Sequence, residues 1–207
     1  MVNLILCILF MLIAYAMTEY IYKKRYNISK QNIYLLVIYL LIGVAIGILY
    51  KVYEYDILKS LKALTIISVV LIVAGIDYRE KIIPNEAIIS ILSIASILIL
   101  INIFKNKVET LAIFIDSTVA MILGAGLFAI SKAVSKNGVG MGDIKIIGAL
   151  GFYLRTYALI GVLMVSLVSI AVYGMFKILT KKATTKDEIA FAPFIAFGVT
   201  TCMILGF

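Results

Sequence analysis

Two aspartates stand where long apolar runs meet polar residues. Asp77 ends the run ALTIISVVLIVAGI, and Asp143 follows GVGMG and precedes another apolar stretch. Ionisable groups beside hydrocarbon are costly, so they are candidates for function. Two carboxylates that share a site do not both ionise easily, so one holds a proton while the other stays charged. Such a pair suits amide hydrolysis, because the anion takes a proton from water while the acid polarises the carbonyl.

The sequence before Asp143 is rich in glycine. Gly140 and Gly142 occupy alternate positions ahead of the carboxylate, and glycine permits unusual backbone dihedrals and close approach of another chain. Such a loop would let an extended substrate lie near Asp143. Lys145 lies two residues further on and points elsewhere if the segment is helical. It could hold Asp143 ionised or contact lipid headgroups.

A short turn is expected after Asp77. Pro84 cannot continue a helix and biases Ile83 towards an extended backbone, while Asn85 can cap the helix that follows. A plainer interpretation makes Asp77 an ordinary residue at a helix end and Asp143 an ordinary helix N-cap. Because both carboxylates coincide with glycine or proline contexts, we favour a functional pair.

The composition predicts that these residues belong to a membrane protein. The chain has 207 residues, of which 64% are hydrophobic and 14% are charged. A soluble domain of this length could not bury so much apolar surface, whereas a bilayer would solvate it. The long continuous apolar runs differ from the short alternating strands of a membrane β-barrel. We therefore expect an all-α, polytopic helical bundle in the lipid bilayer.

Eight apolar segments are candidates for membrane-crossing helices. They cover residues 2–22, 33–50, 57–76, 86–104, 111–131, 144–154, 156–176 and 189–207. The sixth is only about half a span, which predicts a short or tilted helix embedded among its neighbours. The loops leave no room for a soluble domain, so residues 1–207 are expected to form one membrane domain. Within it, residues 1–55 would form two helices that serve as a scaffold or a docking pair, and residues 56–207 a six-helix peptidase core.

The distribution of lysine and arginine predicts the orientation. If the N-terminus lies outside, 13 of the 19 basic residues fall on the inner side and 6 on the outer side, as the positive-inside rule requires. The inner residues are Lys23, Lys24, Arg25, Lys30, Arg79, Lys81, Lys132, Lys136, Lys145, Lys177, Lys181, Lys182 and Lys186; the outer ones are Lys51, Lys59, Lys62, Lys105, Lys107 and Arg155. If residues 144–176 crossed the membrane only once, the last basic loop would lie outside. The split would then be 9 inner and 10 outer basic residues, and the bias would vanish. Both aspartates are therefore expected at the cytoplasmic edge.

Several kinds of chemistry are excluded or disfavoured by composition. The chain has no histidine, which excludes a Ser-His-Asp triad and every histidine metal site. Its two cysteines form no CxxC pair. The net charge of +8 is explained by membrane topology, so no nucleic-acid partner is expected. We expect no metal and no other cofactor.

The segment around Asp77 resembles the first active-site motif of the type IV prepilin peptidases. In that family an aspartate is followed at fixed spacing by an Ile-Pro-Asn or similar turn. The stretch GIDYREKIIPN matches this pattern. The resemblance places Asp77 in the first catalytic position and assigns Ile83, Pro84 and Asn85 to the turn.

Two later segments resemble further motifs of the same family. The stretch GMGDIKIIGALG resembles the second motif, and FAPFIAFG resembles its Pro-Phe-containing last span. The matching residues are Gly140, Gly142, Asp143, Lys145, Gly148–Gly151, Pro193, Phe194 and Gly198. A bare GxGD arises often by chance, but three blocks in this order on an eight-span map are specific. The resemblance covers roughly residues 60–207.

The resemblance implies an integral-membrane aspartyl endopeptidase of the inner (plasma) membrane. Members of the family remove the short basic leader of type IV prepilins and related pseudopilins at the cytoplasmic face. Many bacterial members also N-methylate the product, and these carry an insert with paired CxxC motifs between the first two spans. Here that connection is KKRYNISKQN, without cysteine. We therefore expect peptidase activity and doubt methyl transfer.

Two other functions fit parts of the pattern. Presenilin-like intramembrane proteases are also of the GxGD type, but they place the first aspartate in a mid-span Tyr-Asp pair and carry a Pro-Ala-Leu motif. Here Tyr78 follows Asp77, and the late motif is Ala-Pro-Phe. A small proton-coupled transporter would need carboxylates deep in the membrane, ideally with repeat symmetry. Neither feature is evident in the sequence.

Overall fold

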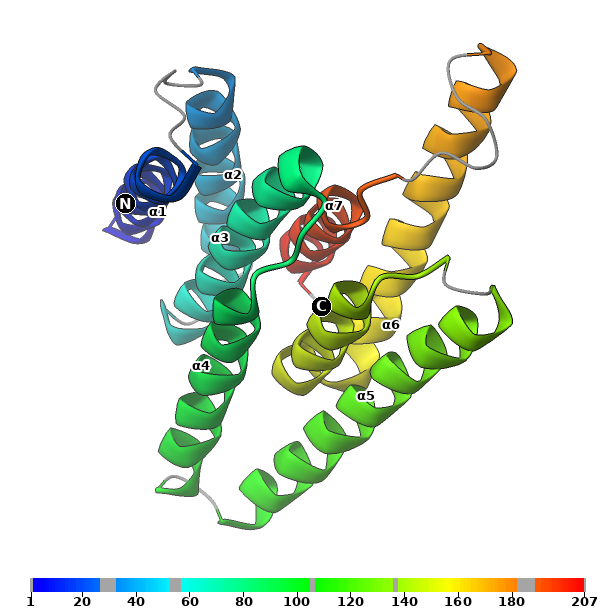
Figure 1. The fold of residues 1–207 in the computed structure, drawn as a ribbon. Coiled ribbons are helices and arrows are strands. Elements are labelled where there is room, and N and C mark those ends of the chain that lie inside the picture. Colours follow the sequence, from blue (N-terminus) through cyan, green and yellow to red (C-terminus); the bar gives the residue numbers. More distant parts are fainter. Residues whose placement is uncertain are drawn as a thin grey trace.

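The computed structural model describes residues 2–26, 33–52, 57–104, 107–135, 138–181 and 189–206 (Figure 1). All regular structure in these ranges is helical. The helices are α1 (Val2–Tyr26), α2 (Ile33–Val52), α3 (Ile57–Glu80), α4 (Asn85–Ile103), α5 (Lys107–Val134), α6 (Met141–Leu179) and α7 (Ala192–Ile204). In the described ranges, five of them are long and apolar enough to cross a membrane. The predicted all-α membrane bundle is confirmed.

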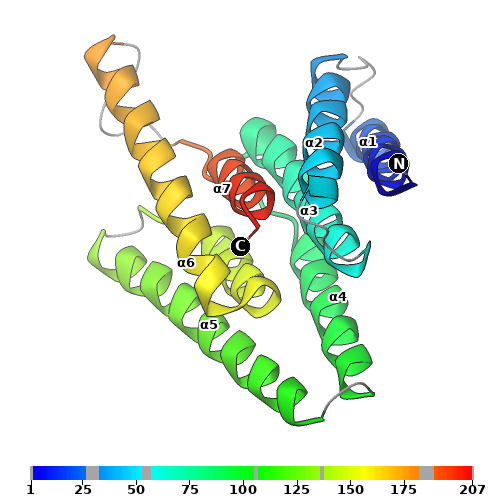
Figure 2. The same ribbon diagram turned by 180° about the vertical axis from the view of Figure 1, so that it is seen from behind.

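Helix α6 is two helices joined at a sharp break. Arg155 has φ 70° and ψ 176°, a conformation that side chains other than glycine adopt only under strain. The chain reverses its direction there, as both ribbon views show (Figures 1 and 2). Arg155 Nε donates to Asp116 Oδ2 at 3.1 Å, and the Thr156 amide donates to Asp116 Oδ1 at 3.3 Å. The break predicted between residues 154 and 156 therefore exists, and an aspartate on α5 holds it.

The last predicted span is shorter than the sequence suggested. Residues 189–207 were expected to form one long helix, but α7 covers only Ala192–Ile204. Its 13 residues extend about 20 Å at 1.5 Å per residue. Pro193 explains this start, because proline is accommodated in the first turn of a helix and not in its interior. The late start leaves the amides of this first turn available to a partner.

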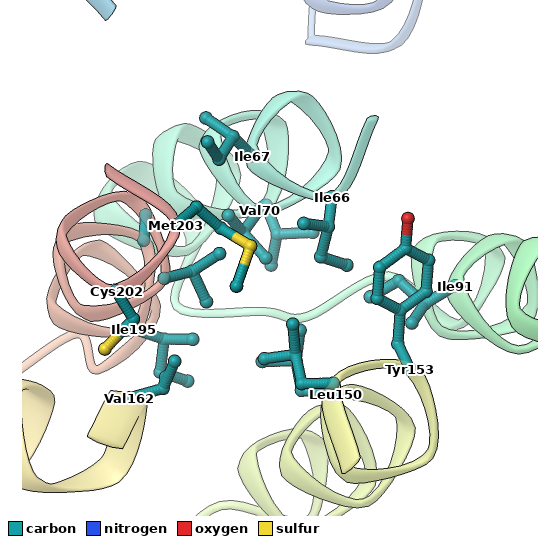
Figure 3. Packing of buried hydrophobic residues seen from close by; sticks show 14 of the residues in the cluster. Ile66, Ile67, Val70, Ile91, Leu150, Tyr153, Val162, Ile195, Cys202 and Met203 are labelled. Atoms are coloured by element: carbon teal, nitrogen blue, oxygen red, sulfur yellow. The ribbon is translucent and has the colours of Figure 1, made fainter. Parts of the chain in front are cut away.

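The core lies around α3, the most buried of the long helices. Ile66 and Val70 of α3 point toward Leu150 of α6 (Figure 3), and together with Ile67 and Ile195 of α7 they belong to one buried cluster. Helix α7 lies between α3 and α6 in both ribbon views, while α1 and α2 pair on the other side of α3 (Figures 1 and 2). The helix that carries Asp77 is therefore fixed from several directions.

Glycines allow two close helix contacts. A Cβ added at Gly151 would lie 2.6 Å from the carbonyl oxygen of Ala120 on α5. A Cβ added at Gly198 of α7 would lie 2.3 Å from Ser166 Oγ and 2.7 Å from the carbonyl oxygen of Val162. Side chains larger than hydrogen would separate these backbones. The two glycines therefore set how closely α6 packs against α5 and α7.

We predict that Gly151→Ala lowers the free energy of unfolding by about 1–3 kcal/mol, because the new methyl group would overlap backbone that cannot move aside. Thermal unfolding of the purified protein in detergent would measure this loss. Gly126→Ala is the matched control on α5, since nothing lies within 4 Å of its added Cβ. Equal unfolding temperatures for the two variants would contradict the predicted close contact.

Candidate active site

Asp77 lies near the C-terminal end of α3 and is only 5% exposed. The helix ends at Glu80, and the Lys81 amide donates to the Asp77 carbonyl at 2.9 Å while Lys81 adopts φ 52°. Pro84 follows with an extended backbone and immediately precedes α4. The predicted proline turn is confirmed. It turns the chain just after the carboxylate and leaves Asp77 inside the bundle.

The start of α7 supplies hydrogen bonds to Asp77. The Ala192 amide donates to Asp77 Oδ2 at 2.9 Å, and the neighbouring Phe191 amide also favours the charged form of this carboxylate. The first amides of a helix have no partner within the helix, and the helix dipole places positive charge there. Pro193 stands in this first turn. The resemblance drew attention to Pro193, but the two amides were missed, because backbone donors have no sequence signature.

Asp143 is the third residue of α6 and is partly buried. Its Oδ2 accepts a hydrogen bond from the Gly140 amide at 3.2 Å. The alternative that Asp143 is the N-cap is wrong, because Gly140 occupies that position. A Cβ at Gly140 would lie 2.9 Å from Asp143 Oδ2. Glycine at position 140 therefore leaves room for the Asp143 carboxylate to lie close to the backbone.

The unusual backbone dihedrals expected of the GxGD glycines are not found at Gly140. Its φ is −68°, which any residue can adopt. Gly142 also serves close approach, because an added Cβ would lie 3.0 Å from the Cβ of Ile83. This contact places the turn after α3 directly against the start of α6.

A hydrogen bond joins the same two segments. Lys145 Nζ donates to Asn85 Oδ1 at 3.2 Å. The prediction that Asn85 caps α4 is wrong, because Pro84 holds the N-cap position and Asn85 is the first helical residue. The side-chain amide accepts from lysine instead. Lys145 accordingly contacts Asn85 and makes no ion pair with Asp143 in the described structure.

The structure thus brings the three sequence blocks together. The negative charge of Asp77 acts on Asp143, so the two carboxylates lie within electrostatic range of each other. One comes from the end of α3 and the other from the start of α6, and the start of α7 completes the site. A buried carboxylate beside a second, more accessible one could activate water between them.

Asp116 does not belong to this site. It joins Arg155 and Thr156 at the break in α6, whereas Asp143 lies 12 residues before that break. At 1.5 Å per residue this separation is about 18 Å along the helix. This separation places Asp116 well away from the carboxylate pair.

Together, the fold and the site define a helical membrane protein with an aspartate pair at its helix ends. The model of the type IV leader peptidase family matches residues 64–175. This match covers more than half of the chain and includes both aspartates, and the chain belongs to that family.

Two relatives are each named prepilin leader peptidase/N-methyltransferase. The Bacillus subtilis protein is 31% identical over 153 residues, covering 72% of this chain and 57% of the relative. The protein of Pectobacterium carotovorum subsp. carotovorum is 28% identical over 145 residues, covering 69% and 50%. The chain therefore spans about half the length of these curated relatives. No solved structure matches it.

We predict that Asp77→Ala speeds hydrogen exchange in the first turn of α7 by about fivefold. The reason is that removing a side-chain acceptor from a helix start costs about 1 kcal/mol. Exchange detected by mass spectrometry on peptides around Ala192 would measure the change. Asp143→Ala is the control, because its carboxylate accepts from Gly140 on its own helix. Unchanged exchange in Asp77→Ala would show that α7 does not depend on this carboxylate.

Proposed function

We propose that this protein is a membrane aspartyl endopeptidase that cleaves the short basic leader of type IV prepilins or pseudopilins. The observation that carries the proposal is the packing of the turn after Asp77 against the start of α6, which carries Asp143, through Ile83 and Gly142. Membership in the type IV leader peptidase family supports the same chemistry. The names of the two relatives support prepilins as the substrate class. The family also favours this reaction over the presenilin-like and transporter alternatives.

The hydrogen bonds favour different roles for the two aspartates. Asp77 accepts from amides at the start of α7, and such donors stabilise the charged form of a carboxylate. Asp143 is more accessible and accepts from one amide, that of Gly140. In the proposed reaction Asp77 takes the proton from water, while protonated Asp143 donates a hydrogen bond to the scissile carbonyl oxygen. Because the two carboxylates interact, their titration is a property of the pair and not of either residue alone.

The neighbouring motif residues would position the substrate. Gly140 is exposed, so an extended peptide could approach the backbone beside Asp143. The pair Lys145 and Asn85 holds the start of α6 against the turn after α3, and Ile83 supports that contact. The leader would lie on the aqueous side while the apolar helix of the substrate lies among the spans.

The proposed activity does not include methyl transfer. The connection between the first two apolar segments, KKRYNISKQN, contains no cysteine. Most of it lies outside the described residues, so this argument comes from sequence alone. The relatives carry N-methyltransferase in their names, and this chain spans about half their length.

The proposed orientation places the N-terminus outside and the aspartates at the cytoplasmic face of the inner membrane. The excess of lysine and arginine on one side of the predicted spans supports it. Asp77 and Asp143 lie near helix ends, as expected for residues at the edge of a membrane. Both basic residues near Asp77, Arg79 and Lys81, belong to the inner set.

We predict that Asp77→Asn and Asp143→Asn each reduce cleavage of a prepilin by at least about 100-fold, because each removes one of the proton-transfer groups. The assay uses purified protein and a prepilin with an intact leader, with products identified by mass. At position 77, asparagine keeps an acceptor oxygen for the amides of α7. An unchanged unfolding temperature of each variant would exclude misfolding as the cause of lost cleavage. Near-normal cleavage by either variant would refute the catalytic pair. Product masses would also reveal methylation, which we expect to be absent.

We predict opposite accessibilities for cysteines introduced at the two ends of α5. Phe104, just before α5, is 92% exposed, and Val134, at its end, is 78% exposed. In intact cells a membrane-impermeant maleimide should label Phe104→Cys, while Val134→Cys should react only after lysis. The native Cys7 and Cys202 are buried, so they give little background. The reverse labelling pattern would invert the proposed orientation.

A further inference from the structure

Cationic side chains surround a cavity at the end of the bundle away from the aspartates. The cavity measures about 310 Å³, and Lys62, Tyr153 and Arg155 contribute to its wall. A second cavity of about 120 Å³ shares these three residues. Lys62 lies 15 residues before Asp77 on α3, which is about 22 Å along the helix. This region is therefore separate from the proposed active site.

The positive charge of this region is only partly compensated. Arg155 Nε pairs with Asp116, which leaves the other donors of the guanidinium for further partners. Lys62 Nζ lies 5.5 Å from the centre of the Tyr153 ring, and no carboxylate of the described residues pairs with it. Lys62 and Arg155 line the same two cavities. Two neighbouring cations, of which only Arg155 is paired with a carboxylate of the described residues, favour the binding of an anion.

The cationic region continues into an apolar one. The smaller cavity shares Ile99 and Phe152 with a third cavity of about 480 Å³ between α4 and α5. Its lining is largely hydrophobic and includes Leu111 and Phe114. Helices α4 and α5 are close at their connection and diverge away from it (Figure 1). The three cavities thus adjoin along one path, which runs from Lys62 and Arg155 to a largely apolar cavity that Lys107 also lines.

We propose that this path binds one anionic phospholipid. Its phosphate would contact Lys62 and Arg155, and one acyl chain would occupy the apolar cavity between α4 and α5. Charge complementarity selects an anionic headgroup, because basic sites between membrane helices bind such groups. Continuity with the apolar cavity selects a lipid over a free anion. The bound lipid would connect α4 and α5 with the strained break at Arg155, and so stabilise the bundle.

The test measures thermal unfolding of delipidated full-length protein in detergent. Dioleoyl phosphatidylglycerol at about ten times its Kd should raise Tm by about 3–6 °C. Dioleoyl phosphatidylcholine and inorganic phosphate are the comparison ligands, and both should leave Tm nearly unchanged. An equal shift with phosphatidylcholine would overturn the requirement for an anionic headgroup. The full shift with phosphate alone would show a free-anion site and overturn the lipid assignment.

Three variants localise the effect. Lys62→Gln should lose most of the shift produced by phosphatidylglycerol, because it removes a headgroup contact without enlarging the side chain. Leu111→Trp should reduce the shift by narrowing the apolar cavity. Lys51→Gln is the matched control, since Lys51 is an exposed lysine on α2 that lines none of these cavities. A wild-type response by Lys62→Gln would refute the proposed site, whatever its own Tm.

Discussion

The burial of Asp77 is the constraint on which the other parts of the site depend. A charged carboxylate that is 5% exposed costs several kcal/mol unless hydrogen-bond donors replace the lost water. The amides at the start of α7 are those donors, although they lie more than a hundred residues further along the chain. The position of α7 is thereby linked to the end of α3. The buried carboxylate on α3 and the helix start of α7 therefore depend on each other.

The glycines of the later sequence blocks allow this arrangement to form. Gly198 brings α7 against Ser166 on the second half of α6, and Gly151 brings the first half of α6 against α5. Gly142 then lets the start of α6 approach Ile83 in the turn after α3. These glycines contribute close packing and no chemical group. Their effect on the site is to set the distance between the helix ends that carry its carboxylates.

Much of this arrangement could be predicted from the sequence, because its signals are local. The apolar runs predict the helices, Pro84 predicts the turn after Asp77, and the interruption near Arg155 predicts the break in α6. The partners of Asp77 and Asn85 could not be predicted in this way. Backbone amides are alike in every residue, and the pairing of Lys145 with Asn85 joins positions 60 residues apart. Such contacts become visible only when the helices are placed in space.

A comparison of two aspartates separates structural from chemical roles. Asp77 and Asp116 each accept from an amide where another helix begins, at Ala192 and at Thr156 respectively. This shared arrangement satisfies a carboxylate in a chain with much apolar surface, and it implies no catalysis. The difference lies in the charged neighbour. Asp116 forms an ion pair with Arg155, which neutralises it, whereas Asp77 acts on a second carboxylate. In the proposed reaction, this like-charged pair would share the proton that hydrolysis requires.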